Sequence, residues 1–248
     1  IPLDGASNFR DLGGYPGHSG RPLRWRQLYR SDHLAGLSAA DQARLQGLSI
    51  RRTLDFRGAD ERAAATYTLA GVDQHALSIE PTVVERMRSL ADRGVAITPA
   101  LTATLMQDLY RSFVDADAPA FAAFFQHLLQ ADGPLVFHCT AGKDRTGFAA
   151  ALLLLALGVP RDLVLQDYLL SNRLYRRPAP VAQSPLPPDV LAVVWTVQAS
   201  FLEAALQAID SRHGSVQAFV AGPLGLGAQG LTRLADRYLQ PGPHAGSP

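Results

Sequence analysis

The feature that most limits what this chain can fold into is a strand, a tight loop and a helix that follow one another between residues 135 and 157. The sequence runs from an apolar segment, Leu135–Phe137, through the loop His-Cys-Thr-Ala-Gly-Lys-Asp-Arg-Thr-Gly, to the run Phe148–Leu157. This last run is apolar on nearly every side, and a helix without a polar face is buried. We therefore predict that the helix lies in the middle of the fold, directly after a central strand.

The loop has the composition of a site for a tetrahedral oxyanion. In a tight loop at a helix N-terminus, successive backbone N–H groups point inward, and the helix dipole adds positive charge. Arg145 adds a planar guanidinium that can hold two oxygens at once. Phosphate is the commonest such ligand, so the sequence predicts a phosphate site.

The same electrostatic field acts on Cys139. A free thiol is only a few per cent ionised at pH 7, but a helix N-terminus and nearby cations lower cysteine pKa values to roughly 3.5–7.5. A drop of about 3 pH units corresponds to about 4 kcal/mol of preference for the thiolate. We expect an activated nucleophile aimed at phosphorus. The alternative, a small buried hydrophobic residue, leaves the crowding of cations, hydroxyls and glycines around the cysteine unexplained.

The loop resembles the C-x5-R-[S/T] signature of cysteine-dependent protein tyrosine phosphatases. Its full form is similar to that of a bacterial subgroup, related to tyrosine and dual-specificity phosphatases, with phosphoinositide phosphatase activity among its members. Further matches are NFRDLGGY at 8–15, LYRSDHL at 28–34, YLLSN at 168–172, the tail at 201–239, and DFRGADE at 55–61, where phenylalanine replaces the usual leucine. The resemblance implies an α/β fold: a mostly parallel sheet of about four to five strands flanked by helices, with a helical insertion and a lid.

The resemblance also implies roles for the loop. Cys139 attacks phosphorus to form a cysteinyl-phosphate that water hydrolyses, and Arg145 stabilises the phosphoryl oxygens. His138 is expected to orient the loop from behind, and the Thr146 hydroxyl to hydrogen-bond the cysteine sulfur. The residues predicted to hold phosphate are Thr140, Ala141, Gly142, Lys143 and Thr146. The lysine resembles one found in phosphatases that accept polyanionic inositol headgroups, and the alternative is a solvated side chain at the loop edge.

The leaving oxygen needs a proton, and the sequence offers two candidate acids. Many tyrosine phosphatases use an aspartate in a Trp-Pro-Asp loop, but neither Trp25 nor Trp195 precedes Pro-Asp. Members of the subgroup carry an aspartate inside the phosphate loop, and Asp144 matches it, so we predict Asp144 as the general acid with Asp55 second. The alternatives are that Asp144 shapes the loop and that Asp55, at a strand end, orients Arg57 or a loop amide.

Composition limits the setting of this chemistry. The 248 residues predict one phosphatase domain, 1–240, and a mobile tail, 241–248. The net charge of +1 gives no reason to expect nucleic acid as a partner, and the longest apolar run is too short for stable membrane insertion. One cysteine excludes an intrachain disulfide. No signal peptide is visible but the chain starts at Ile1, so cytoplasmic and secreted locations stay open. We expect a monomer.

Turn residues and periodicity predict the surrounding elements. Strands are expected at Arg26–Arg30, Ser49–Phe56 and Gln74–Ile79. Helices are expected at Glu80–Ala100, Thr102–Val114, Ala120–Gln130, Arg161–Leu174 and Asp189–Arg212, and a last helix should end near Leu239. Ser38 followed by Asp41 resembles a capping box, so a helix should begin there. The proline-rich segment Arg176–Pro188 is expected to be a surface loop, either a lid over the site or a disordered segment.

The leading hypothesis is a metal-independent cysteine phosphatase, because histidines and carboxylates show no metal-ligand spacing and the nucleophile needs neither metal nor cofactor. Its partners would be phosphotyrosine proteins, with phosphoserine, phosphothreonine or phosphoinositide substrates also open. The alternative is a catalytically inactive phosphate-binding module, although an inactive relative would more often have lost the nucleophile. A rhodanese-type sulfurtransferase ranks third because it gives no reason for the Arg145–Thr146 pair.

Overall fold

The computed structural model describes residues 1–177 and 186–242, and these build a five-stranded sheet in the order β1-β2-β5-β3-β4. The strands are β1 (Arg10–Asp11), β2 (Leu28–Ser31), β3 (Arg52–Asp55), β4 (Asp73–Ala76) and β5 (Leu135–His138). β1 runs antiparallel to β2, and the other neighbouring pairs are parallel. The predicted α/β fold with a mostly parallel sheet is therefore confirmed.

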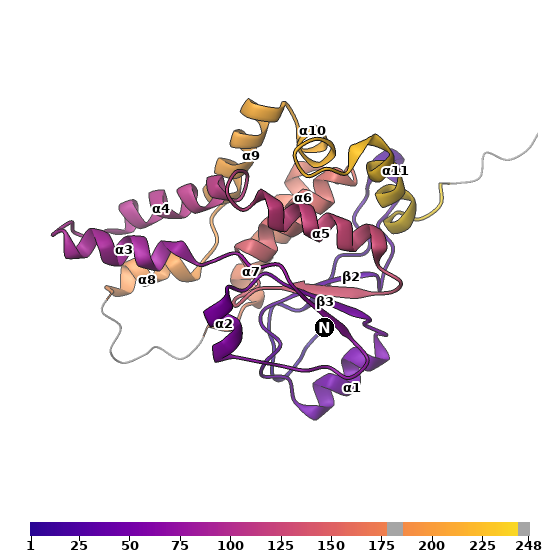
Figure 1. Ribbon diagram of the computed structural model, residues 1–248, viewed down its shortest axis with the longest axis horizontal. Helices are drawn as coiled ribbons and strands as arrows, with labels where there is room; N and C mark the ends of the chain where they lie inside the picture. Colours follow the sequence, from indigo (N-terminus) through magenta and orange to yellow (C-terminus); the bar gives the residue numbers. More distant parts are fainter. Residues whose placement is uncertain (178–185, 243–248) are drawn as a thin grey trace, which may run out of the picture.

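β5 is the central strand, and its side chains alternate between two hydrophobic cores, as the pleat of a strand requires. Leu135 and Phe137 enter the larger core, which contains side chains of α5 (Ala118–Gln130) and α6 (Arg145–Ala156). Val136 enters the smaller core, where it meets Leu45 of α1 (Ala39–Gly47). Figure 1 shows α1 on one face of the sheet and both α5 and α6 on the other.

The helix after the loop is buried as predicted. Every residue of α6 except Leu155 is buried. The helix packs against α7 (Arg161–Leu174) and α10 (Val216–Ala221). Gly158, with a φ of 83°, ends it in the left-handed conformation that favours glycine. The sheet and its helices thus hold both ends of the loop at 139–144 in rigid, buried structure.

The remaining helices largely follow the sequence pattern. They are α2 (Ala59–Ala64), α3 (Thr82–Asp92), α4 (Pro99–Ser112), α8 (Pro188–Trp195), α9 (Ala199–His213) and α11 (Gly227–Tyr238). The predicted capping box is confirmed, because the Ser38 hydroxyl accepts from the Asp41 amide and the Asp41 carboxylate accepts from the Ser38 amide. α3 and α4 form a hairpin between β4 and α5 and extend, together with α8, away from the sheet (Figure 1).

Predictions of element boundaries are wrong at three places for a backbone reason. The helix expected at Glu80–Ala100 ends at Asp92, before Gly94, whose φ is 78°. The strands expected from Arg26 and from Ser49 begin later, at β2 and β3, because both residues have positive φ, 61° and 57°. An extended strand has negative φ, so each residue marks a turn before its strand.

The single helix predicted at Asp189–Arg212 is also wrong, because the structure has two helices, α8 and α9, that meet at 51°. The break is held by Asn172 of α7. Its side-chain amide donates to the Val197 carbonyl, and its oxygen accepts from the Val197 amide, both at 2.8 Å. A side chain from another helix therefore replaces the helical hydrogen bonds at this point, which periodicity does not reveal.

Parts of two predicted segments lie outside the described residues: 178–185 of the predicted surface loop or lid and 243–248 of the predicted tail. Within the part of the chain that the structure describes, no single helix has the length and apolar character to cross a membrane, although the bent pair α8 and α9 together has both.

Candidate active site

The loop between β5 and α6 is shaped by a glycine at its turn. Gly142 has a φ of 64°, and a Cβ atom there would lie 2.2 Å from the Ser31 carbonyl oxygen of β2. Both the conformation and the space therefore require glycine. The loop passes directly into α6, since Arg145 is the first residue of that helix and Asp144 occupies its N-cap position. The predicted strand–loop–helix arrangement is confirmed.

The N-terminal segment holds the loop from outside. The Gly142 carbonyl accepts from the Asn8 amide at 2.8 Å and from the Arg30 guanidinium at 2.9 Å. Arg30 and Arg10 both bind the Asp167 carboxylate, at 2.7 and 2.8 Å. Burial alone would raise the pKa of Asp167, but the two arginines hold it below its usual value. The two arginines thus form buried ion pairs with Asp167, and they support the loop.

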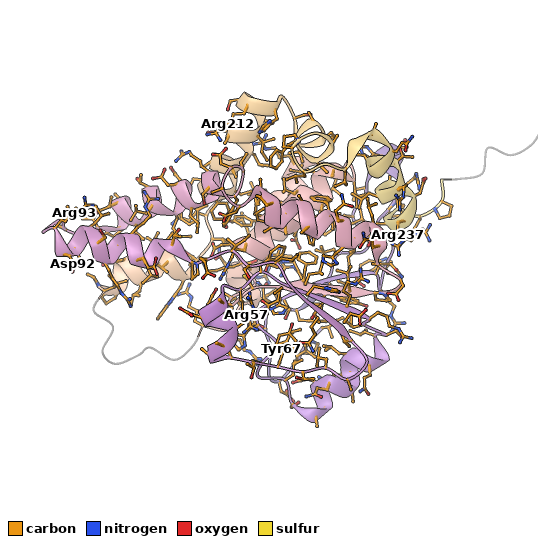
Figure 2. The ribbon with its side chains drawn as sticks, in the orientation of Figure 1. Arg57, Tyr67, Asp92, Arg93, Arg212 and Arg237 are labelled. Carbon is orange, nitrogen blue, oxygen red and sulfur yellow. The ribbon has the colours of Figure 1, made fainter. Side chains whose placement is uncertain are left out.

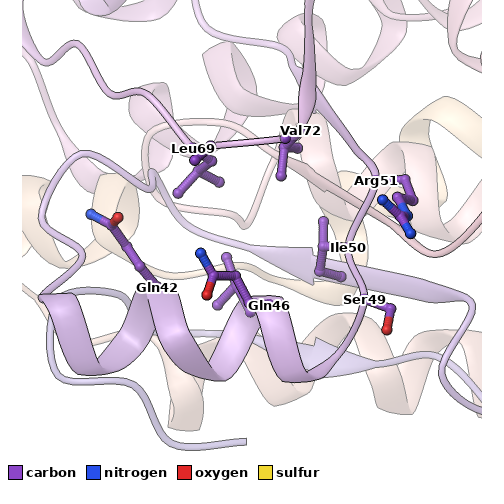
Figure 3. Close-up of a pocket in the computed structure, with 10 residues that line it drawn as sticks. Gln42, Gln46, Ser49, Ile50, Arg51, Leu69 and Val72 are labelled. Carbon is purple, nitrogen blue, oxygen red and sulfur yellow. The ribbon is translucent and has the colours of Figure 1, made fainter.

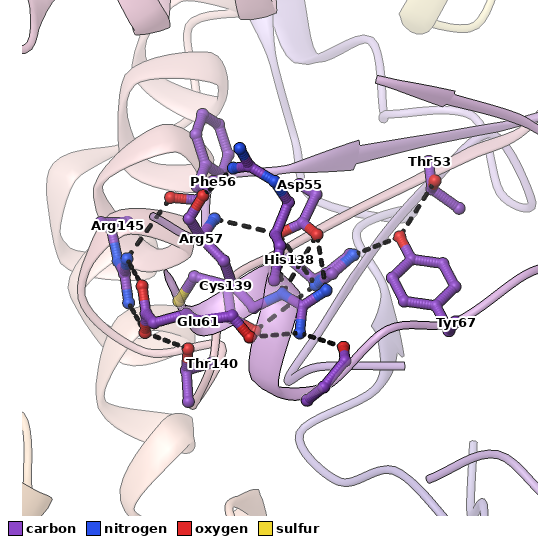
Figure 4. Close-up of polar contacts among 12 residues, drawn as sticks. Thr53, Asp55, Phe56, Arg57, Glu61, Tyr67, His138, Cys139, Thr140 and Arg145 are labelled. Atoms are coloured by element: carbon purple, nitrogen blue, oxygen red, sulfur yellow. Dashed lines mark hydrogen bonds and ion pairs between the residues drawn. The ribbon is translucent and has the colours of Figure 1, made fainter. Parts of the chain in front are cut away.

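Glu61 of α2 fixes the arginine of the loop (Figure 4). Its carboxylate binds both terminal nitrogens of Arg145, at 2.6 and 2.9 Å, and also accepts from the Thr140 hydroxyl. The Ile79 carbonyl accepts a further bond from Nη1 at 2.8 Å. Burial would raise the pKa of Glu61, but its bonds to Arg145 lower it to about 2. Among the described residues, Nε–H and the second Nη2–H are left without an acceptor, and they form the edge suited to two phosphate oxygens.

Asp144 is bonded through both carboxylate oxygens. Oδ1 accepts from the Tyr110 hydroxyl at 3.0 Å, and Oδ2 accepts from the Lys143 ammonium at 2.6 Å. Lys143 is 6% exposed and also lies 3.4 Å from the Thr196 carbonyl after α8. The lysine is therefore not the solvated side chain at the loop edge that the sequence left open. Its ammonium lies between the Asp144 carboxylate and the end of α8.

Asp55 and His138 lie behind the loop. Asp55 binds Arg57 through both oxygens, at 3.0 and 2.8 Å, and its Oδ1 is 3.8 Å from Nδ1 of His138. Nε2 of His138 lies 2.7 Å from the Tyr67 hydroxyl, and complete burial lowers the histidine pKa to about 4, so the ring is neutral. Cζ of Arg57 lies over the ring of Tyr67, 5.6 Å from the ring centroid, and both residues are labelled in Figure 2. Asp55 thus orients Arg57, one of the two options that the sequence left open.

The nucleophile candidate is enclosed. Cys139 is a free cysteine and 2% exposed. The Thr146 hydroxyl is buried and has no hydrogen-bond partner among the described residues. The predicted bond from Thr146 to the cysteine sulfur is therefore not formed in this structure. Thr140 is exposed and Ala141 half-buried, so the loop reaches the surface at its first turn.

A cavity of about 120 Å³ opens beside the loop, at its junction with α3, α4 and α8. Asp144 and Arg145 form its polar wall. The other lining residues are mostly apolar: Glu80, Pro81, Val83, Val84, Met106, Leu109 and Val194. If Arg145 holds a phosphate, a narrow apolar pocket next to it can receive the organic part of the phosphate ester.

A second cavity, of about 290 Å³, lies between the end of α1 and residues 69–72 (Figure 3). It includes Arg51, directly before β3, whereas Cys139 directly follows β5. Because β3 and β5 are parallel, this cavity lies at the opposite end of the strands from the loop. It takes no part in the site described above.

Sequence reasoning missed four side chains that complete the site: Glu61, Tyr67, Tyr110 and Asp167. Glu61 could have been found, because it lies in the matched segment at 55–61, three residues after a glycine that begins a helix. Asp167 lies directly before the matched segment at 168–172, which was a weaker signal. The two tyrosines gave no signal in the sequence.

A mostly parallel α/β sheet that carries a C-x5-R loop at the N-terminus of a buried helix is the arrangement of cysteine-type phosphatases. A family model described as the tyrosine phosphatase family matches residues 1–240. The chain therefore belongs to the tyrosine phosphatase family, and it is a protein tyrosine phosphatase.

Individual proteins show the same likeness. A Cupriavidus necator protein named as a tyrosine-protein phosphatase is 40% identical over 250 residues, which cover 96% of this chain and 88% of that protein. The triple specificity protein phosphatase PtpB of Mycobacterium tuberculosis is 31% identical over 256 residues, which cover 88% and 91%. Among solved structures, the core catalytic domain of the PP-IP phosphatase SIW14 from S. cerevisiae is similar at 14% identity, with a TM-score of 0.40, over 86% of this chain and 95% of that one.

Proposed function

We propose that this phosphatase works through a cysteinyl-phosphate, with Cys139 as nucleophile, Arg145 as the phosphate-binding cation and Asp144 as general acid. The observation that carries this proposal is the bracing of Arg145 by Glu61, at 2.6 and 2.9 Å. The Glu61 carboxylate binds the two terminal nitrogens of the guanidinium and leaves its Nε edge free for phosphate. An arginine fixed before substrate arrives stabilises developing charge without reorganising.

The proposed reaction has two steps. The Cys139 thiolate donates an electron pair to phosphorus, the bond to the ester oxygen breaks, and that oxygen takes a proton from Asp144. Water then attacks phosphorus and gives a proton back to the Asp144 carboxylate, while the phosphorus–sulfur bond breaks and the thiolate is restored. Arg145 and the amides of the loop hold the phosphoryl oxygens in both steps.

Asp144 is the better candidate acid on geometry. It lines the cavity together with Arg145, and its side chain is 19% exposed. Asp55 has both oxygens bound to Arg57 and lies on the His138 side of the loop. A general acid must reach the leaving oxygen. A phosphate dianion in the loop would also compete with Asp144 for the Lys143 ammonium. This competition would free one oxygen of the Asp144 carboxyl group to carry a proton.

The proposed substrates are phosphotyrosine proteins first, with phosphoserine, phosphothreonine and phosphoinositide esters as further classes. The apolar cavity next to Arg145 suits an aromatic ring. The buried Lys143 gives a second positive charge near the phosphate site, which suits substrates with more than one anionic group. The triple specificity of the relative PtpB supports a range wider than phosphotyrosine. We propose that the protein acts as a monomer.

The test is phosphate release, with a chelator present, from a phosphotyrosine peptide, a phosphoserine peptide and a monophosphorylated phosphoinositide. Cys139→Ser should abolish release from all three. Asp144→Asn should slow release about 10²- to 10⁴-fold, the usual contribution of a general acid. Asp55→Asn is the matched control, and it should lower stability through loss of the Arg57 pair while it retains most of the activity.

Two outcomes would contradict the proposal. A wild-type protein that binds phosphopeptide but releases no phosphate would be the inactive binding module. An active protein that is slowed far more by Asp55→Asn than by Asp144→Asn would exchange the roles of the two carboxylates.

A further inference from the structure

Two buried tyrosines meet on the inner side of Asp144. Tyr110 of α4 and Tyr168 of α7 are 0% and 1% exposed, and their hydroxyl oxygens are 2.7 Å apart. The Tyr110 hydroxyl is also 3.0 Å from Oδ1 of Asp144. The two rings come from helices that are far apart in the sequence, so this contact exists only in the folded protein.

The chemistry of the three groups fixes the direction of their hydrogen bonds. An ionised carboxylate can only accept, so Tyr110 donates its one proton to Asp144. The Tyr168 hydroxyl must then donate to Tyr110. Burial, with the Asp144 carboxylate adding to it, raises the pKa of both tyrosines well above the ordinary value of 10, so both stay protonated. The chain of donors runs from Tyr168 through Tyr110 to Asp144.

This chain makes the two oxygens of Asp144 unequal. Oδ1 is held by Tyr110, while Oδ2 accepts from the Lys143 ammonium, which sits at the end of a flexible four-carbon side chain. The carboxylate makes no capping bond to its own helix. Tyr110 is itself rigid, because its ring packs against Phe113 at 5.1 Å and Phe201 at 6.0 Å. Of the two oxygens, Oδ2 is therefore the one that can carry a transferable proton.

We propose that Tyr110, backed by Tyr168, is a positioning residue for the general acid: it anchors Oδ1 of Asp144 so that the proton reaches the leaving oxygen from Oδ2. This inference rests on the proposed function of Asp144. Tyr110 does not touch the reacting atoms and acts only through the carboxylate. Its removal should therefore affect reactions that need the proton and spare those that do not.

The experiment compares two aryl phosphates in Tyr110→Phe, a change that keeps the ring and removes the hydroxyl. Phenyl phosphate has a poor leaving group that needs a proton, and 2,4-dinitrophenyl phosphate has a good one that does not. We expect kcat/KM for phenyl phosphate, which reports the steps up to departure of the leaving group, to fall about 10-fold or more, because the general acid is displaced but still present. The kcat/KM for 2,4-dinitrophenyl phosphate should stay within about 2-fold of wild type, because its leaving group needs no proton and no binding contact is removed. Tyr168→Phe should give a smaller change of the same kind.

Tyr238→Phe is the matched control. Tyr238 is 2% exposed, and its hydroxyl donates to the Leu128 carbonyl at 2.8 Å, so the change removes an equally buried hydroxyl bond between α11 and α5. It should lower stability without changing the ratio of the two kcat/KM values. The double variant Tyr110→Phe with Asp144→Asn should be no slower on phenyl phosphate than Asp144→Asn alone.

The inference is wrong if Tyr110→Phe lowers kcat/KM equally for both substrates, or if its effect on phenyl phosphate multiplies with that of Asp144→Asn. Failure of the proposed function looks different. In that case the wild-type protein releases no phosphate from either aryl ester, or Asp144→Asn leaves the phenyl phosphate rate unchanged.

Discussion

Replacement of Glu61 by glutamine is the sharpest test of how the site is held together. Glutamine keeps the size of the side chain but removes the charge that faces Arg145 at 2.6 Å. The ordinary glutamate pKa of 4.5 falls to about 2 in the folded protein. At about 1.4 kcal/mol for each pH unit, this corresponds to roughly 3 kcal/mol of stability. Solvent reaches a fifth of the Glu61 side chain, so we expect about 2–3 kcal/mol.

The pH window follows from the direction of the shift. A depressed carboxyl pKa contributes stability that is fully present above the unfolded value, 4.5, and that is lost as the pH falls toward about 2. Urea unfolding at pH 7 should therefore place Glu61→Gln about 2–3 kcal/mol below wild type. Near pH 2.5 the two proteins should differ by less than about 1 kcal/mol, because wild-type Glu61 is then losing its charge as well.

Activity should change in parallel. An Arg145 without its carboxylate is free to move, and displacement by about 1 Å can cost about 100-fold in rate, so kcat/KM should fall about 10- to 100-fold. Glu85→Gln, an exposed glutamate on α3, is the control and should match wild type in both assays. A Glu61→Gln protein as stable as wild type at pH 7, or a deficit that is the same at both pH values, would refute the reasoning.

Three further changes test other parts of the site. Gly142→Ala should lower the free energy of unfolding by about 1–3 kcal/mol and remove most of the activity. Gly20→Ala, at a similar φ of 71° but with open space around it, should lower stability less and leave kcat unchanged. Thermal unfolding and phosphate release measure the two effects. Asp167→Asn should lower urea stability by about 3–5 kcal/mol because it leaves two buried arginines unpaired, and the exposed Asp210→Asn should stay within about 1 kcal/mol. Tyr67→Phe should cost about 1–3 kcal/mol in the same assay, because the buried histidine before the cysteine loses its 2.7 Å partner; a Tyr67→Phe protein as stable as wild type would contradict that role.

The loop of the site and the strand and helix beside it could be predicted from the sequence, because the residues that identify them are neighbours in the chain. The strand, the loop and the apolar helix are contiguous, and the capping box at Ser38 needs only its own four residues. The contacts that fix Arg145 and that separate α8 from α9 could not be predicted in this way. Glu61 meets Arg145, and Asn172 breaks the helix at Val197, across long stretches of chain. Such contacts are decided by tertiary packing, which periodicity and composition do not encode.

The anchoring of the Gly142 carbonyl has a consequence for how the protein becomes active as it folds. Its two donors, Asn8 and Arg30, are 134 and 112 residues away in sequence, and Arg10 reaches Asp167 over 157 residues. Contacts of such separation carry a large loop-closure entropy and form late. An intermediate with β5 and α6 already joined still lacks these bonds, so recovery of activity should lag behind recovery of helical structure on refolding. We therefore expect the first residues of the chain to be the last to bind the loop.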